Sequence, residues 1–174
     1  GNVQVTRDAG KSWTNVTANI RGLPRNAWVS SIDAGRFDQG VVFATFDLHT
    51  FGDMAAYAYM STDFGKTWTS LVAPGSPVRG YAHVIKQDLV AKNLLFLGTE
   101  FGLWVSVDGG ATWSRYKGGD LPPVAVRDLA IQPRDNDLVI ATHGRGIWIV
   151  DDITPLRALT PATLANDVVF AKVR

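Results

Sequence analysis

The sequence has no cysteine among its 174 residues. This absence excludes disulfide bonds, thiolate zinc sites and cysteine nucleophiles. It also has no apolar run that approaches the ~18 residues of a membrane span, and no basic-then-apolar pattern of a signal peptide at its start. Its 17 basic and 16 acidic residues leave a net charge of +1, so no global field attracts nucleic acid or an anionic membrane. We therefore expect neither a nucleic-acid partner nor a membrane span.

What the sequence does contain is typical of a globular β protein. Hydrophobic residues make up 46% and charged residues 19%, which excludes an intrinsically disordered chain. Glycine occurs 17 times, together with 6 tryptophans and 8 phenylalanines. Glycines and aromatic residues at regular intervals indicate many short strands joined by tight turns.

One eight-residue pattern occurs three times and can be written S/T-x-D-x-G-x-S/T-W. Its copies span residues 6–13, 61–68 and 106–113, at a spacing of about 45 to 55 residues. In each copy the aspartate can accept backbone N–H bonds within a turn. The glycine permits a positive φ, and the tryptophan can bury a large apolar surface. The motif is therefore interpreted as a structural clip, with these aspartates and tryptophans: Asp8, Trp13, Asp63, Trp68, Asp108 and Trp113.

Short β-prone runs surround each copy of the motif. Residues 41–45, 95–99 and 138–142 are apolar and each ends in threonine, as expected of buried strands. A further strand is predicted before each run, at 29–33, 83–87 and 127–132, and another after it, at 57–61, 103–107 and 147–150. The motif then leads into a last short strand at 68–71 and 113–116. Each unit is thus four antiparallel strands, and a period near 50 residues predicts an all-β fold, a partial β-propeller. A short helical turn is expected only within 156–165.

The three motif copies resemble the Asp-box, or BNR repeat, of sialidases, xyloglucan-degrading glycosidases, sortilin-type (VPS10) propellers and photosystem assembly propellers. Residues 138–156 resemble the closing blade of large bacterial sortilin-like BNR proteins, which are often labelled glycosyl hydrolases. The resemblance implies an extracellular or periplasmic location. It places a fourth, decayed box at Asp152, with Arg157 where the tryptophan would stand.

The predicted strands add up to an incomplete ring. Two strands come first, then two complete four-stranded units, then three strands, whereas propellers have about four or more blades. We expect a C-terminal fragment of a larger propeller, with about three to four blades over residues 1–157 and a tail at 158–174. Residues 167–173 alternate enough to form one more strand. The first expected partner is therefore the rest of the same propeller.

Candidate ligand-binding residues follow the second strand of each unit, on the face opposite the boxes. The aligned threonines predict that Phe46, Glu100 and His143 begin equivalent loops, with Arg145 nearby. A carboxylate beside an imidazole can transfer protons, and an arginine can bind a carboxylate or sugar acid. The long first loop, 46–53, adds Asp47, His49 and Asp53, as either an acid–base or metal cluster or simply a solvated loop. The loops between units add Arg21, Arg25, Arg79, Asp120 and Arg127, and His83 is expected in the core.

Two functions fit these residues. The first is a secreted binding module that recognises a glycan or peptide on this face. The alternative is part of a sialidase- or xyloglucanase-like glycoside hydrolase, which needs two carboxyl groups about 5–9 Å apart, completed by blades outside this chain. A structural assembly factor is a third class. No cofactor and no metal site are predicted, and no catalytic residue is assigned.

Overall fold

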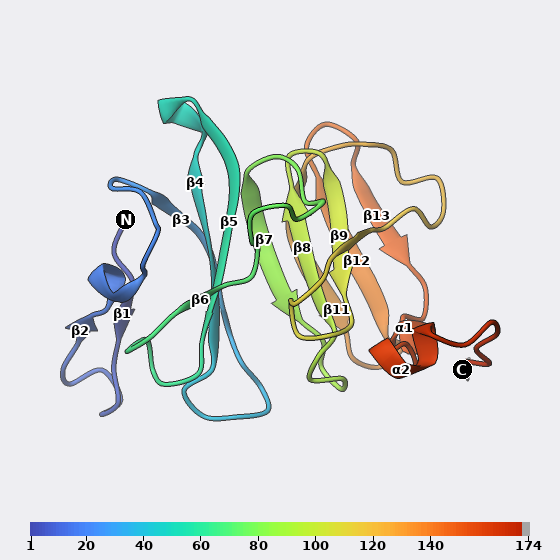
Figure 1. The fold of residues 1–174 in the computed structure, drawn as a ribbon, viewed down its shortest axis with the longest axis horizontal. Helices are drawn as coiled ribbons and strands as arrows, with labels where there is room; N and C mark the ends of the chain where they lie inside the picture. The colour runs from blue at the N-terminus through green and yellow to red at the C-terminus, as the bar shows by residue number, and fades with distance from the viewer. Residues whose placement is uncertain (172–174) are drawn as a thin grey trace.

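The computed structural model describes residues 1–171 and consists mainly of antiparallel strands (Figure 1). Three larger sheets stand side by side, preceded by a short two-stranded pair. The strands are β1 Gln4–Val5, β2 Thr14–Asn15, β3 Trp28–Ala34, β4 Val42–Leu48, β5 Asp53–Ser61, β6 Thr69–Ser70, β7 Ala82–Gln87, β8 Leu95–Thr99, β9 Gly102–Ser106, β10 Ser114–Arg115, β11 Val126–Gln132, β12 Asp137–Thr142 and β13 Ile147–Val150.

Hydrogen bonding joins consecutive strands in simple meanders. We call β1–β2 the N-terminal pair, β3–β6 the first sheet, β7–β10 the second sheet and β11–β13 the third sheet. Every pairing is antiparallel. This confirms the predicted strand order, including the three-stranded last unit.

Alternate residues of each strand face different neighbouring sheets, as the two-residue period of a strand requires. In β8, Leu95 and Leu97 pack toward the first sheet in one core cluster, whereas Phe96 packs toward the third sheet in another. A third cluster joins Val3 and Val16 of the N-terminal segment to the first sheet. The near-continuous apolar sequence of β8 is therefore explained by burial on both faces.

Helical structure is confined to four short segments: the 3₁₀ turns η1 Thr17–Asn19 and η2 His49–Phe51, and the helices α1 Thr154–Arg157 and α2 Pro161–Leu164. In the described part of the chain no helix is both long and apolar enough to cross a membrane. The strand predicted over 167–173 is wrong for residues 167–171, which form no strand; residues 172–174 lie outside the described part.

The three Asp-box turns share one set of hydrogen bonds. Asp63 Oδ1 accepts the Thr67 amide at 2.8 Å, and Asp63 Oδ2 accepts the Thr67 hydroxyl at 2.7 Å. The Ser61 hydroxyl donates to the same carboxylate and accepts the Gly65 amide. The turns at Asp8 and Asp108 repeat these bonds. The predicted clip is confirmed at all three aspartates.

The prediction that all three box tryptophans are buried is wrong for Trp13, which is 59% exposed, while Trp113 is 5% exposed and Trp68 is half-buried. The reason lies in the preceding sheet. The Trp113 indole lies in the core between the first two sheets and donates to the Leu71 carbonyl at 2.8 Å. Trp68 packs at the edge of the smaller cluster that joins the N-terminal segment to the first sheet. No sheet precedes Trp13 in the described chain.

The fourth box is decayed, and its Arg157 has a different partner. The Arg157 guanidinium forms two bonds of 2.9 and 3.0 Å with Asp88, a fully buried carboxylate in the turn between β7 and β8. It also donates to Asn136 Oδ1 at 2.7 Å. Burial opposes ionisation of Asp88, but the bonds from Arg157 and from backbone amides outweigh it and lower the pKa of this carboxyl. Arg157 thus anchors α1 across two sheets.

Candidate functional site

The same β-bulge occurs in the first strand of every sheet. Pairing shifts by one residue between Val29 and Ser31, between Ala82 and Val84, and between Val126 and Asp128. A bulge leaves one residue outside the ladder and re-aims its side chain, and bulges often occur beside active sites. The residues left over at the three equivalent positions are Ser30, His83 and Arg127.

Pairing across the bulge also aligns the ends of the second strands. Val29 pairs with Phe46, Ala82 with Thr99, and Val126 with Thr142. The equivalent residues that follow are therefore Asp47, Glu100 and His143. The prediction that Phe46 belongs to this set is wrong: Phe46 is fully buried within β4, because the first sheet is offset by one residue from the threonine alignment.

His83 joins the second and third sheets through both of its ring nitrogens. Its Nε2 lies 3.1 Å from Glu100 Oε2, and its Nδ1 lies 3.2 Å from Arg127 Nη1. Because a guanidinium can only donate hydrogen bonds, Nδ1 must accept and Nε2 must carry the proton given to Glu100. Arg127 Nη2 lies 3.3 Å from His143 Nδ1. Glu100 and His143 are therefore linked through His83 and Arg127 and make no direct pair.

Aromatic rings extend this cluster to the first sheet. The Tyr81 ring stacks on His49 with ring centroids 4.5 Å apart and meets the edge of His83 at 4.7 Å. His49 Nδ1 lies 2.7 Å from Asp47. We call the connected set the rim cluster; it contains all three histidines of the chain. Its members are Asp47, His49, Tyr81, His83, Glu100, Arg127 and His143.

The rim cluster holds its groups in defined charge states. Burial lowers the pKa of His83 and outweighs the opposing bond to Glu100, so this imidazole is neutral at pH 7. Burial also opposes ionisation of Glu100, but hydrogen bonds from Tyr81 and His83 outweigh it, so the pKa of Glu100 is lowered. Burial raises the pKa of the Tyr81 hydroxyl, which therefore stays protonated. The cluster thus offers an anion at Glu100 and a cation at Arg127.

The structure brings together only some of the predicted candidates. Glu100, His143, Asp47 and His49 lie in the rim cluster. Arg145 is exposed in the neighbouring loop, where its carbonyl accepts the Trp148 indole at 3.0 Å. Asp53 bonds the Tyr57 hydroxyl at 2.8 Å and stands apart from the cluster. The predicted long loop 46–53 is shorter than expected, since β4 continues through Leu48, η2 spans His49–Phe51 and β5 begins at Asp53.

Two central residues were underestimated from the sequence. His83 is buried as expected, yet it is the hub of the cluster; Tyr81 was not singled out at all. The signal that could have found them is the bulge position, which the alignment of motifs alone does not reveal. Within residues 1–171 no group of three or more acidic or histidine side chains is arranged to hold a metal ion.

Comparison with known proteins agrees with this architecture. The BNR/Asp-box repeat model matches residues 59–70 and 104–115. No curated protein sequence matches the chain significantly. Among solved structures, an ancestral GH74 enzyme matches with a TM-score of 0.53 at 19% identity, over 67% of this chain and 14% of that one.

Two further structures are similar. YCF48 bound to a D1 peptide matches with a TM-score of 0.53 at 18% identity, over 80% of this chain and 41% of that one. PorZ of Porphyromonas gingivalis matches with a TM-score of 0.49 at 21% identity, over 74% of this chain and 19% of that one. The chain therefore spans less than half of each of these structures. The chain therefore contains BNR/Asp-box repeats at residues 59–70 and 104–115, and its four-stranded antiparallel sheets have the fold of part of a β-propeller.

Proposed function

We propose that this chain is the ligand-binding part of a larger BNR propeller, and that the rim cluster recognises a peptide or glycan. The observation that carries the proposal is the cluster itself. Three adjacent sheets contribute polar side chains from equivalent positions; hydrogen bonds join those of the second and third sheets, and the stacking of His49 on Tyr81 links the first sheet to them. A few convergent polar groups beside aromatic rings are typical of ligand sites.

Arg127 is the best-placed donor for such a ligand. Its side chain is exposed, and no carboxylate among residues 1–171 lies within ion-pair distance of it. Its two hydrogen-bond partners are the neutral His83 and the ring of His143. A ligand acceptor can therefore bond the guanidinium without displacing a salt bridge, and such charge-assisted bonds are strong.

Glu100 and the stacked pair Tyr81–His49 complete the binding surface. Glu100 is only partly buried, so its carboxylate can accept from a ligand hydroxyl or amide. His49 is exposed and stacks on Tyr81, which offers a flat face to a sugar ring or an apolar side chain. A solved propeller of similar fold is YCF48 bound to a D1 peptide. The likeness concerns the fold; the peptide is that protein's ligand.

The remainder of the propeller is proposed as the constant partner of this chain. Ile147 and Ile149 of β13 are 71% and 58% exposed, on the face of the third sheet that points away from the second. Burying such side chains against another sheet is favourable by about 1.5–3 kcal/mol each. Further blades would cover them. The proposed location, extracellular or periplasmic, and the sortilin-type relationship rest on the sequence resemblance.

A glycoside hydrolase is the second candidate. Asp47 and Glu100 are carboxylates at equivalent rim positions of adjacent sheets, and GH74 is an enzyme of similar fold. With its lowered pKa, Glu100 is ionised at neutral pH and would serve as nucleophile or base, whereas a general acid needs a raised pKa. The acid would then come from another residue or another blade.

The proposal is tested by screening the chain on peptide and glycan arrays and measuring the dissociation constant of the best ligand. Arg127→Gln and Glu100→Gln should each weaken binding by roughly tenfold or more. Arg36→Gln is the control, because Arg36 is an exposed arginine in the turn between β3 and β4, at the opposite end of the strands. If Arg127→Gln and Glu100→Gln both leave affinity unchanged, the rim cluster is not the site. Hydrolysis of a glycan that disappears in Glu100→Gln would favour the enzyme.

A further inference from the structure

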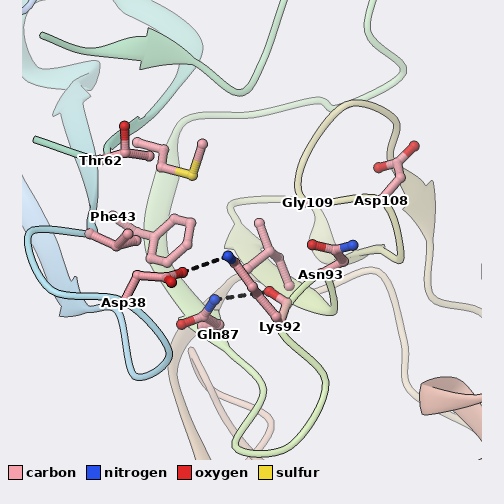
Figure 2. A pocket seen from close by; sticks show the side chains of 11 residues that line it. Asp38, Phe43, Thr62, Gln87, Lys92, Asn93, Asp108 and Gly109 are labelled. Carbon is pink, nitrogen blue, oxygen red and sulfur yellow. Dashed lines mark hydrogen bonds and ion pairs between the residues drawn. The ribbon is translucent and has the colours of Figure 1, made fainter.

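A recess lies between the first and second sheets, at the end of the strands opposite the rim cluster. It has a volume of about 530 Å³. Val41, Phe43, Met60 and Leu95 form its apolar floor. Figure 2 shows Phe43 and Asp38 on one side of it and Asn93, Gly109 and Asp108 on the other. Clefts of this size with an apolar floor and few polar groups are typical binding sites.

One residue of the third Asp-box turn, Gly109, leaves the recess open. The position directly after the box aspartate is occupied by Ala9, Phe64, Gly109 and Ile153 in the successive boxes. The amides of the last three donate to equivalent carbonyls: Phe64 to Gly40 at 3.0 Å, Gly109 to Asn93 at 2.9 Å and Ile153 to Asn136 at 2.8 Å. The positive φ found at Phe64 and Gly109 falls one residue earlier in the fourth box, at Asp152.

In the other two turns this position carries an apolar side chain, which occupies part of the space beside the turn. Ile153 is 1% exposed and packs in the core between the second and third sheets. Phe64 lies against Gly40, where even a Cβ atom would come within 2.8 Å of the ring. At Gly109, by contrast, an added Cβ atom would meet only Asn93 Oδ1 within 4 Å, at 3.6 Å. The space that Ile153 or Phe64 fills elsewhere is empty here.

The charges around the recess match a basic group. Asp38 and Asp108 contribute two carboxylates and Lys92 one ammonium, which pairs with Asp38 at 2.5 Å. In the other two turns an arginine also lies close to the apolar side chain. The Arg7 guanidinium covers the Phe64 ring at 4.3 Å, and Arg157, one helical turn after Ile153, binds the carboxylate of Asp88.

We propose that this recess is a second binding site, which takes an aromatic or branched apolar side chain from a partner polypeptide with an arginine or lysine next to it. The apolar side chain occupies the place that Phe64 and Ile153 take in their own junctions. The basic neighbour lies over Asp38 and Asp108. The site is on the Asp-box face, so it is independent of the ligand proposed for the rim cluster.

The test uses the dipeptide Ac-Phe-Arg-NH₂ as the probe, titrated into the ¹⁵N-labelled chain and followed by amide chemical shifts. Saturable shifts are expected at Gly109, Gly110 and Asn93, and not at Glu100 or His143. Ac-Ala-Arg-NH₂ and Ac-Phe-Glu-NH₂ should each bind about tenfold more weakly or worse. Equal affinity for the three probes, or shifts spread over both faces, would overturn the proposal.

Two substitutions at one position make the test specific. Gly109→Phe places in the recess the side chain that Phe64 supplies in the preceding box, and should abolish binding. Gly109→Ala imposes a similar positive-φ strain, since Gly109 has φ +74°, but leaves the recess open and should retain the affinity for Ac-Phe-Arg-NH₂. Undiminished binding by a folded Gly109→Phe variant would contradict the proposal. If that variant does not fold, Asp38→Asn is the alternative test. It should weaken binding of Ac-Phe-Arg-NH₂ severalfold, and unchanged affinity would contradict the proposal.

Discussion

At the Asp-box end of the sheets, polar side chains bond within their own turn, and the same bonds recur in three turns. At the rim end, the equivalent positions carry different side chains in each sheet, and these bond across the sheets. Asp63 is satisfied by Ser61 and Thr67 of its own loop, whereas Arg127 reaches His83 of the neighbouring sheet. Bonds within a single turn stabilise the fold, while side chains that converge from several sheets form a surface that can bind a ligand at the rim.

The largest expected effect compares two box tryptophans. Trp113→Ala should lower the free energy of unfolding by about 3–5 kcal/mol, because it empties a core site and strands the Leu71 carbonyl. Trp13→Ala should change it by no more than about 0.5 kcal/mol, as for other exposed positions. Urea unfolding of the two variants measures the difference. Equal losses would mean that the tryptophan acts within its own turn and not through the preceding sheet.

The next effect concerns a box carboxylate. Asp108→Ala should cost about 1–3 kcal/mol, since the Thr112 amide and the Ser106 and Thr112 hydroxyls lose their acceptor. Asp108→Asn keeps one acceptor oxygen and should cost less. Both are measured by urea unfolding. If the asparagine variant is as unstable as the alanine variant, negative charge and not hydrogen bonding holds the turn.

The pKa values of the box aspartates test whether the hydrogen bonds of the turn form independently of the burial of the box tryptophan. Hydrogen bonds from the Ser12 hydroxyl and amide lower the pKa of Asp8 to about 2. Hydrogen bonds from the Thr67 amide and hydroxyl lower the pKa of Asp63 to about 2 as well. These carboxylates are ionised in the fold at pH values where the unfolded chain is protonated. Their contribution is therefore complete above pH 3.8 and is lost as the pH falls toward 2. NMR titration should give similar midpoints for the two. An ordinary midpoint at Asp8 alone would show that its clip needs a buried tryptophan.

The smallest expected effect is on the pH dependence of stability, and it comes from His83 in the rim cluster. Because the pKa of His83 is lowered in the fold from 6.5, the unfolded chain binds its proton first as the pH falls. His83 therefore makes stability decrease as the pH falls below about 6.5. Thermal unfolding between pH 7 and 5 should be less pH-dependent in His83→Gln than in the wild type. A steeper dependence in the variant would reverse the assigned direction.

The sequence was sufficient for the fold because the features that set the fold are local. The box motif, the apolar runs and the turns predicted the strand order and the hydrogen bonds of Asp8, Asp63 and Asp108. The sequence was insufficient where the exposure of a side chain depends on a neighbouring sheet. The exposure of Trp13 depends on what precedes it in space, and a local pattern contains no such information.

The rim was predicted only in part for a similar reason. Glu100 and His143 were placed on the correct face, since strand order alone fixes which loops share an end. The β-bulges were not visible in the sequence, so the one-residue offset that puts Asp47 and not Phe46 on the rim was missed. His83 and Arg127 were likewise separated into core and loop, although β7 and β11 hold them side by side.

The most direct test of the division between the two ends is a binding measurement on folded variants from each end. With the ligand selected on arrays, the dissociation constants of wild type, Glu100→Gln and Asp63→Asn are determined by calorimetry at a temperature where all three are folded. We predict that Glu100→Gln loses roughly tenfold or more in affinity while Asp63→Asn binds as the wild type does. Loss of affinity in Asp63→Asn together with full affinity in Glu100→Gln would contradict the account.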